Sequence, residues 1–600
     1  MTAYLGDGPG GGGEVAEVIL ATMAVSGVKN LWFTSGSDLV PFQEAAAKAR
    51  STGTPAPVIV GSVHEHVALS AAMGETMVSG GPVAVVAHAD LGLLSFGGAI
   101  HNASRGGYPV LIATGYPPTS ADERTASVYW LQQRSDQGAI VRQYVKWDYR
   151  LGLHEDASVV TARAIQVALS APTGPSYLAL PTEASIRKFE GPQRLVAAGE
   201  LGIATLGSGP PEQVGVIADR LLAAAKPLVI TDRVGRSASA VALLEELATE
   251  FALGVSASRH RMNLADGHPS RAVPFRLDEA DAILVLEHPV PWVPVQEAPD
   301  EACFVAAVSE DPVQASIPVY EFRAAERVTA ASEPFLAALL EEMRRRRTAD
   351  QARHHAERYR AFEGEAARRA KLRAASVAAA LGKPVPSPAA IGAALSSVLG
   401  PDDVFTWELA DSSLVERCRP GTLFDKGGSS LGWAVAAAYG ARLADRVRPA
   451  ACLTGDGSYL FGVPSALLWS QAQHEAPVLT VICNNRGYRT GTTSLVERYP
   501  DGFAARAGDF TGGTFDPPPD FSAEARAAGA FGRRVTTTSE LHEALESARR
   551  ATEVECRPAV VDVWLPALAT GAHPHAEERG GHAGPGGEGR SRPHTGATDG

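Results

Sequence analysis

Short, continuous apolar runs alternate with helix-length amphipathic segments along most of the chain. The runs fall at residues 30–33, 58–60, 83–87, 110–113, 228–231, 283–286, 303–307, 404–406, 450–453, 478–483 and 560–563. Apolar strands without strict alternation, separated by helices, are typical of parallel sheets that are covered on both faces. The pattern therefore predicts an α/β protein built from doubly wound parallel sheets.

Glycine, proline and charge divide this pattern into three blocks with loose ends. We expect α/β domains over residues 14–186, 190–330 and 385–568. A charged, alanine-rich stretch over 331–384, closed by the sequence PVPSP, predicts a helical connector between the second and third domains. Residues 1–13 are rich in glycine and residues 570–600 have almost no apolar side chains, so both ends are expected to be disordered.

Composition excludes several classes of protein. The chain has 600 residues and a formal charge of −13, which gives no support to a nucleic-acid-binding surface. Its five cysteines are scattered without a CxxC pair, a pattern that fits the reducing cytoplasm. The start lacks the features of a signal peptide, and no stretch supplies the ~18 consecutive apolar residues of a membrane span. His573, His575 and His582 are interpreted as part of a solvated tail, not as a metal site.

The most informative segment runs from residue 455 to residue 488. One predicted strand ends in a glycine turn that carries Asp456, and the next ends in Asn484–Asn485, so both fall at the carboxyl edge of a parallel sheet. A hard divalent cation prefers oxygen ligands, which Asp456, Asn485 and the backbone carbonyl of Gly487 can supply. Such an ion would hold a diphosphate. The residues that let the backbone approach that diphosphate are Gly455, Gly457 and Ser458.

The triplet GDG, followed after 26 residues by NN, resembles the signature of thiamine-diphosphate enzymes. A second match lies in the first domain, where VHEHVALSAAMGE is similar to the family's glutamate segment. The resemblance makes Glu65 the residue that hydrogen-bonds the aminopyrimidine ring. Moving a proton there promotes loss of the thiazolium proton, after which the cofactor serves as an electron sink. Thiamine diphosphate and Mg²⁺ are the cofactors that this resemblance implies.

The resemblance covers nearly all of residues 14–568 and assigns further positions. In GGSSLGWAVAAAYG, Leu431 matches the apolar side chain over which the family bends its cofactor, and Ser429 matches a backbone contact to the amino group. Tyr488, at the end of the NNRGY segment, belongs to the expected cofactor-binding set. The family places active sites between subunits, which implies a homodimer or a homotetramer.

Three positions point to one branch of the family. Ser37, His88 and His268 resemble the serine and two histidines around the substrate in benzoylformate decarboxylases. A serine can hold a substrate carboxylate, and histidines that titrate near neutrality can move protons. Two of the three have a simpler interpretation: Ser37 could cap the helix that starts near Leu39, and His268, before a proline, could pack in a loop.

Other segments leave alternatives open. The block 130–148 looks closer to acetolactate-synthase-like proteins, and its Trp130, Gln133, Asp136 and Arg142 either line the entrance or pack the dimer. Acetolactate synthases carry FAD in the middle domain. Here Gly235 is the only glycine of the turn after residues 228–231, so a dinucleotide fingerprint is missing and FAD is not expected, whereas another adenine nucleotide stays open.

We therefore expect decarboxylation of a small 2-oxo acid that depends on thiamine diphosphate and Mg²⁺. The product would leave as an aldehyde or pass to an acceptor, as in a carboligase of the acetolactate-synthase type. A third alternative, from another class, is an inactive cofactor-binding paralogue with a structural or regulatory role. The intact Glu65, Asp456 and Asn485 argue against it. The sequence does not name the acyl group.

Overall fold

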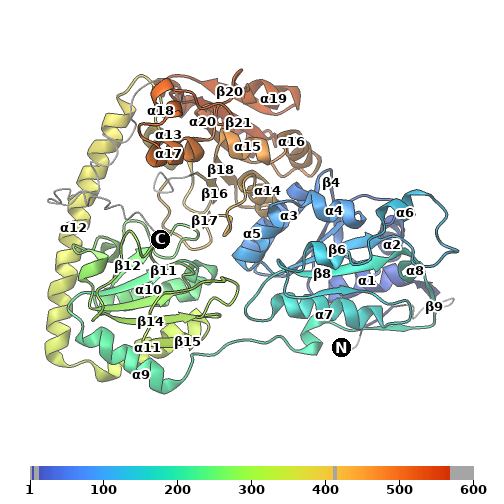
Figure 1. The fold of residues 1–600 in the computed structure, drawn as a ribbon, viewed down its shortest axis with the longest axis horizontal. Helices are drawn as coiled ribbons and strands as arrows, with labels where there is room; N and C mark the ends of the chain where they lie inside the picture. The colour runs from blue at the N-terminus through green and yellow to red at the C-terminus, as the bar shows by residue number, and fades with distance from the viewer. Residues whose placement is uncertain (1–2, 6–11, 410–414, 568–600) are drawn as a thin grey trace, which may run out of the picture. The chain divides into compact units, whose positions relative to one another are not determined.

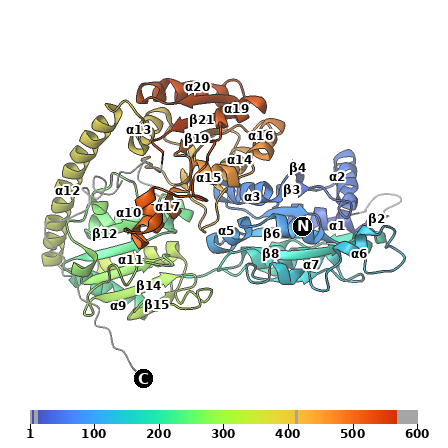
Figure 2. The same ribbon diagram turned by 45° about the horizontal axis from the view of Figure 1, so that its top comes forward.

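The computed structural model describes residues 3–5, 12–409 and 415–567. The tail over 570–600, with its three histidines, lies outside the described residues. The chain divides into two compact units. The first comprises residues up to 485 together with 518–566, and the second comprises residues 486–517 together with the segment that begins at Ala567. All three parallel sheets belong to the first unit (Figures 1 and 2).

The first domain is built on a six-stranded parallel sheet with the order β4-β3-β5-β6-β8-β7. Its strands are β3 (Asn30–Thr34), β4 (Val58–Ser62), β5 (Val83–Ala87), β6 (Val110–Tyr116), β7 (Asp148–Arg150) and β8 (Ser176–Pro181). Its helices are α1 (Val15–Val25), α2 (Val40–Thr52), α3 (Glu65–Ser79), α4 (Ala89–Ser95), α5 (Ala99–Gly106), α6 (Val128–Gln132), α7 (Ala157–Leu169) and α8 (Thr182–Ser185), with a 3-10 turn at Gly138–Ile140. On β5, Ala84 and Val86 join the core under α1, α2 and α7, whereas Val83 and Val85 join the core under α3. Both faces are covered, which explains the continuous apolar runs.

The amino-terminal residues differ from the prediction of a disordered end. Two short strands, β1 (Ala3–Leu5) and β2 (Gly12–Glu14), pair antiparallel with β10 (Gln193–Leu195) and β9 (Lys188–Glu190). Leu5 is buried against α1 together with Phe189 and Leu195. The glycine-rich composition was misleading because partners almost two hundred residues away satisfy these backbone groups.

The middle domain carries a five-stranded parallel sheet with the order β12-β11-β13-β14-β15. Its strands are β11 (Pro227–Thr231), β12 (Gly254–Ala257), β13 (Ala282–Leu286), β14 (Phe304–Ser309) and β15 (Glu326–Thr329). Its helices are α9 (Pro211–Ala223), α10 (Ala238–Glu250) and α11 (Ser332–Arg346), with 3-10 turns at Ala198–Leu201, Val234–Arg236, Pro269–Arg271 and Leu277–Glu279. α11 packs on α9 and α10 through Phe335 and Leu339, so the first part of the predicted connector belongs to this domain. Only α12 (Ala349–Leu381), the long helix in Figure 1, leads on to the third domain.

The third domain repeats the topology of the first. Its six parallel strands have the order β17-β16-β18-β19-β21-β20, which matches the first sheet strand for strand. They are β16 (Val404–Glu408), β17 (Leu423–Phe424), β18 (Ala450–Gly455), β19 (Leu479–Asn484), β20 (Phe531–Val535) and β21 (Ala559–Trp564). The helices are α13 (Pro388–Val398), α14 (Ala434–Ala444), α15 (Asp456–Phe461), α16 (Pro464–Gln473), α19 (Phe521–Ala527) and α20 (Leu541–Glu553), with a 3-10 turn at Thr538–Glu540. The predicted fold class, three doubly wound parallel-sheet domains, is confirmed.

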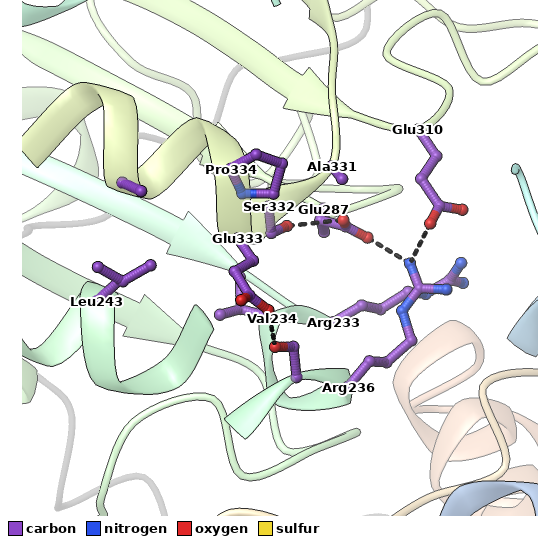
Figure 3. A pocket seen from close by; sticks show the side chains of 12 residues that line it. Arg233, Val234, Arg236, Leu243, Glu287, Glu310, Ala331, Ser332, Glu333 and Pro334 are labelled. Atoms are coloured by element: carbon purple, nitrogen blue, oxygen red, sulfur yellow. Dashed lines mark hydrogen bonds and ion pairs between the residues drawn. The ribbon is translucent and has the colours of Figure 1, made fainter. Parts of the chain in front are cut away.

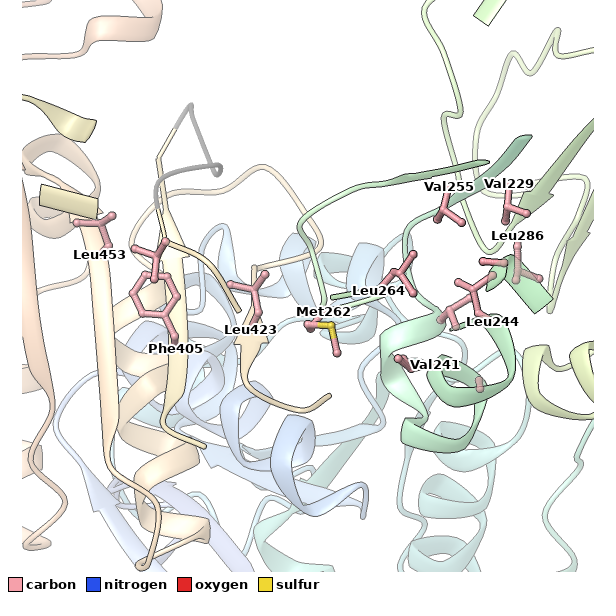
Figure 4. Packing of buried hydrophobic residues seen from close by; sticks show 14 of the residues in the cluster. Val229, Val241, Leu244, Val255, Met262, Leu264, Leu286, Phe405, Leu423 and Leu453 are labelled. Carbon is pink, nitrogen blue, oxygen red and sulfur yellow. The ribbon is translucent and has the colours of Figure 1, made fainter. Parts of the chain in front are cut away.

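Two kinds of packing join these sheets within the first unit. One apolar cluster includes Val229 and Leu264 of the middle domain together with Phe405 and Leu423 of the third, as Figure 4 shows. The other is the pairing of α3 with α14. A Cβ atom at Gly74 would lie 1.9 Å from the carbonyl oxygen of Ala437, so only glycine permits this approach of the two backbones.

The second unit contains α17 (Arg489–Arg498) and α18 (Phe503–Ala507), and Gly487 forms an isolated antiparallel bridge with Thr514. Across the described residues of both units, no helix is long and apolar enough to cross a membrane.

Candidate active site

Asp456 and Asn485, from the two halves of the 455–488 motif, follow strands at one edge of the third sheet. β18 and β19 are neighbours, with Gly455 paired to Cys483, so Asp456 and Asn485 follow adjacent strand ends. Asp456 is 2% exposed, and its Oδ1 accepts the N–H of Gly457 at 2.8 Å. The Oδ1 of Asn485 is buried without a hydrogen-bond partner among the described residues. A buried acceptor left unpaired costs about 1–3 kcal/mol, so this oxygen suits a bound ligand.

The donor set at this edge fits a hard cation. No group of three or more histidine, cysteine, aspartate or glutamate side chains in the described part of the chain is placed to hold a metal. A cation here would therefore take mixed oxygen ligands, from the Asp456 carboxylate and the Asn485 amide, as Mg²⁺ prefers. Gly455, Gly457 and Ser458 lie at the start of α15, where backbone N–H groups favour an anion.

Gly487 and Tyr488 belong to the second unit. Arg486 has a φ of +65°, which turns the chain directly after Asn485. The Tyr488 N–H donates to the Gly513 carbonyl at 2.7 Å, and its ring meets that of Phe515 edge-on at 5.1 Å. The assignments of Gly487 to the metal and of Tyr488 to the cofactor therefore stay predictions.

Glu408 is a residue of this region that the sequence interpretation missed. It ends β16, it is 4% exposed, and its carboxylate accepts the N–H groups of Gly432, Trp433 and Ala434 at 2.9–3.0 Å. Burial raises the pKa of Glu408, whereas the nearby Lys426 ammonium lowers it. A carboxylate that binds the first N–H groups of α14 fixes the chain just after Leu431. The sequence feature that could have identified Glu408 is an acidic residue at the end of an apolar strand.

The loop before α14 is held from the first domain as well. Asn102 of α5 donates to the Ser430 carbonyl and accepts the Ser430 N–H, each at 3.0 Å. The exposed Ser429 hydroxyl lies 3.1 Å from Nε2 of His101. These contacts leave Ser429 and Leu431 at the junction of the first and third domains.

Glu65 is brought to the same junction. It is the first residue of α3, half-buried, and His64 caps this helix by accepting the His66 N–H at 3.1 Å. The buried His66 places its Nε2 3.2 Å from the carbonyl oxygen of Gly432, the residue after Leu431. The structure therefore brings the start of the Glu65 helix next to the loop that carries Leu431.

His88 follows β5 and makes two side-chain contacts. Its Nδ1 lies 2.5 Å from Oδ1 of Asp38, and its Nε2 lies 2.8 Å from the amide nitrogen of Gln132. The hydrogen bond with Asp38 is the main cause that raises the pKa of His88; burial lowers this pKa, and Asp90 and Glu65 add smaller upward effects. The influence of Glu65 indicates that the two predicted catalytic groups share one region.

Ser37 and His268 differ from His88 in their surroundings and in the contacts that their side chains make. Ser37 is exposed in the loop before Asp38; Leu39, not Ser37, is the N-cap of α2, so the capping role is not observed. His268 caps the 3-10 turn Pro269–Arg271, with its Nδ1 accepting the Ser270 N–H and its Nε2 3.2 Å from the Thr249 hydroxyl. Both ring nitrogens are thus engaged inside the middle domain, and the structure does not join His268 to the other predicted residues.

The 130–148 block keeps its two interpretations. Arg142 binds Asp136 at 2.9 Å and Asp148 at 2.8 Å, which ties the segment to β7. Trp130 of α6 is 55% exposed, and the guanidinium of Arg124 lies over its ring. Gln133 is half-buried at the end of α6.

The middle domain has a cavity of about 460 Å³ at the carboxyl ends of its strands, shown in Figure 3. Its lining includes Arg233, Arg236 and Glu287. Arg236 donates to Glu287 and lies 4.0 Å from Glu310, and Arg233 lies 3.5 Å from Asp232. Carboxylates already balance both guanidinium groups, so this cavity gives no positive indication of a phosphate-bearing ligand.

Two family models match the first and third domains, which hold Glu65, His88, Asp456 and Asn485. Residues 13–140 match the N-terminal TPP binding domain of thiamine pyrophosphate enzymes, and residues 409–563 match the C-terminal TPP binding domain. The chain belongs to the thiamine pyrophosphate enzymes. Thiamine pyrophosphate is thiamine diphosphate under its other name, so the predicted family and cofactor are confirmed.

Curated relatives and solved structures lie within this family. Benzoylformate decarboxylase of Pseudomonas aeruginosa is 26% identical over 528 residues, covering 84% of this chain and 90% of that protein. IlvX of Mycobacterium tuberculosis, named for the acetolactate synthase large subunits, is 35% identical over 144 residues, covering 24% of this chain and 26% of that protein.

The 4-hydroxybenzoylformate decarboxylase of Rhodococcus jostii superposes with a TM-score of 0.71 at 21% identity. The benzoylformate decarboxylase of Polynucleobacter necessarius gives 0.72 at 19% identity. Each alignment covers 92% of this chain and 99% of the other. At these identities the likeness establishes the shared fold.

Proposed function

We propose that this enzyme decarboxylates a 2-oxo acid with thiamine diphosphate and Mg²⁺ and releases the aldehyde. The observation that carries the proposal is His88, held by Asp38 on one ring nitrogen and close enough to Glu65 for its pKa to respond. A benzoylformate decarboxylase aligned over 528 residues is the relative whose activity supports it.

The residues present suit the cofactor. Asp456 and Asn485, with the carbonyl of Gly487, would hold Mg²⁺ against the diphosphate. The groups that would contact the cofactor itself are Gly455, Gly457, Ser458, Tyr488, Ser429 and Leu431. When bound, thiamine diphosphate supplies an electron sink for the carbon–carbon bond that breaks.

The chain's own groups then move protons. Glu65, at the start of α3, would hold a proton at the ring nitrogen of the aminopyrimidine. His88 would deliver a proton to the former keto carbon after carbon dioxide has left and then take the hydroxyl proton as the aldehyde forms. Ser37, exposed in the loop after β3, would bind the substrate carboxylate. We assign no role in this step to His268, because both of its ring nitrogens are bound elsewhere.

We further propose that the active form is a homo-oligomer in the cytoplasm. The scattered cysteines support the compartment, and the dimeric or tetrameric state would be measured by light scattering.

A second candidate activity is carboligation, in which another carbonyl compound captures the activated carbon. The 35% identity to IlvX over 144 residues favours it for that segment.

A panel of 2-oxo acids that includes benzoylformate and 4-hydroxybenzoylformate, with carbon dioxide, aldehyde and acyloin all measured, separates the two activities. In His88→Ala, turnover should fall ~10²–10⁴-fold while hydrogen–deuterium exchange at the thiazolium carbon stays near the parental rate. His154→Ala, which changes an exposed histidine of the same domain, is the matched control and should behave as the parent. Full decarboxylase activity in His88→Ala would remove the proposed relay and leave carboligation as the leading function.

A further inference from the structure

Asp38 is a buried carboxylate 50 positions before His88 in the chain. It is 2% exposed at the end of the loop after β3, and its two oxygens have different tasks. Oδ1 lies 2.5 Å from Nδ1 of His88, and Oδ2 accepts the N–H of Ala89 at 3.0 Å. One side chain thus binds both the imidazole and the backbone that follows it.

The backbone at this point is strained. Ala89 has a φ of +41°, a conformation that residues other than glycine rarely adopt. Such strain persists only where surrounding contacts enforce it, and it is found preferentially at functional sites. The hydrogen bond from the Ala89 N–H to Asp38 is a contact that enforces it here.

Two glycines make room for this pair. A Cβ atom at Gly36 would lie 2.5 Å from Nδ1 of His88, and one at Gly115 would lie 1.8 Å from Oδ2 of Asp38. Neither neighbour could move without breaking the contact between His88 and Asp38. The loop after β3 and the end of β6 are therefore shaped around the two side chains.

We infer that Asp38 is the positioning residue of His88, fixing its tautomer and ring orientation so that Nε2 is the nitrogen that exchanges protons with the substrate. This inference rests on the proposed function, in which His88 is the relay. Because a carboxylate only accepts, the proton sits on Nδ1 and the lone pair of the neutral ring is on Nε2. The Gln132 amide, 2.8 Å away, can donate to that lone pair, and the substrate would take its place.

The carboxylates around His88 all act on the protonation of its ring in the same direction. Asp38 from the loop after β3, Asp90 from α4 and Glu65 from α3 all favour the protonated ring. Arg134 pairs with Asp90 at 2.8 Å. Asp38 is the one that touches the imidazole, so its loss changes both the charge balance and the geometry.

The test compares Asp38→Asn with the parent holoenzyme. An asparagine has one acceptor oxygen where the carboxylate has two, so it can accept from His88 or from Ala89 but not from both, and the ring is held less firmly. Turnover should fall about 10–100-fold, the range seen when the outer hydrogen-bond partner of a metal-ligating histidine is removed. The limb of the kcat–pH profile that His88 causes should move to lower pH. Thiazolium hydrogen–deuterium exchange should stay within about twofold of the parent, since His88 acts later.

Three further variants make the result decisive. Asp156→Asn removes the carboxylate that caps α7 in the same domain, and it should lower stability without moving the pH profile. In a His88→Ala background, Asp38→Asn should change turnover less than twofold, because the imidazole that Asp38 positions is already absent. Should Asp38→Asn fail to bind cofactor, Gly36→Ala decides, since its methyl group displaces the ring while Asp38 stays intact.

The outcomes separate this inference from the proposed function. If His88→Ala loses turnover but Asp38→Asn keeps the parental rate and pH profile, the positioning role is wrong and the relay stands. If both variants keep full activity, the relay itself is wrong. A loss in Asp38→Asn that persists undiminished in the His88→Ala background would show a purely structural role.

Discussion

Because Glu75 is a buried carboxylic acid, we expect an unusual dependence of the protein's stability on pH. It lies on α3, 3% exposed, and accepts hydrogen bonds from the Asn30 amide at 2.9 Å and the Trp32 indole at 2.7 Å. Burial raises its pKa to about 7 from an ordinary value of 4.5, although both hydrogen bonds and Lys29 oppose the shift. The folded chain therefore binds this proton more tightly than the unfolded chain, and its stability falls as pH rises between about 4.5 and about 7.

The magnitude follows from the shift. The rise in the pKa from 4.5 to about 7 corresponds to about 3.5 kcal/mol in total, of which about 3 kcal/mol is lost between pH 4.5 and pH 8. Glu75→Gln cannot ionise, and its single amide oxygen can accept from Trp32 or from Asn30 but not from both, which costs about 1–3 kcal/mol at every pH. The variant should be clearly less stable than the parent at pH 4.5. The gap should then close or reverse by pH 8, because only the parent loses about 3 kcal/mol on the way.

Hydrogen exchange of the α3 amides, followed by mass spectrometry on peptides within residues 65–79 and corrected for intrinsic rates, reports this local opening free energy. Glu44→Gln, an exposed position on α2, is the matched control and should differ from the parent equally at both pH values. A gap between Glu75→Gln and the parent that does not change from pH 4.5 to pH 8 would refute the reasoning.

Two further changes test the cofactor edge and the helix pairing. In Asp456→Ala, thiamine diphosphate with Mg²⁺ should no longer raise Tm as it does for the parent. Chelating Mg²⁺ from the parent should have the same effect. If the variant shows the parental rise in Tm, Asp456 is not a metal ligand. Gly74→Leu places a side chain against the Ala437 backbone and should destabilise the chain by at least about 2 kcal/mol in urea unfolding, whereas Gly364→Ala, in open space on α12, should stabilise it by about 0.5–1 kcal/mol.

Local patterns in the sequence were sufficient to predict the parallel sheets and one edge of the candidate site. Continuous apolar runs predicted the strands because both faces of each sheet are covered, as on β5. The GDG and NN segments predicted neighbouring strand ends because parallel strands place their carboxyl ends on one edge, and Gly455 does pair with Cys483. These inferences need only the periodicity of the chain and the rules of parallel sheets.

Contacts between segments far apart in the sequence could not be predicted from such local patterns. Asp38 reaches His88 across 50 positions, and Glu408 binds N–H groups of residues 432–434, although neither acid stands in a motif. At His268 a local interaction competes with the predicted catalytic role, which stays a prediction. Its histidine–proline pair matched a family position, yet the proline starts a 3-10 turn that the histidine caps, so a local interaction engages both ring nitrogens.

The shared topology of the first and third domains explains how the site is divided. In both sheets the strand after the edge pair leads directly to a predicted site residue: β5 leads to His88, and β18 leads to Asp456. The helices that follow the edge strands, α3 and α14, start at Glu65 and just beyond Leu431.

The same correspondence extends to the acids that support these loops. β3 leads to Asp38, which binds the imidazole and backbone at the start of α4, and β16 ends in Glu408, which binds the backbone at the start of α14. In each domain, then, a buried carboxylate from the carboxyl edge of the sheet fixes the start of a helix next to a predicted site residue. Since α3 and α14 meet reciprocally, with Gly74 against Ala437 and Gly440 against Ala71, the two equivalent loops face one junction. One topology used twice therefore supplies the proposed proton-handling groups from the first domain and the proposed diphosphate-holding groups from the third.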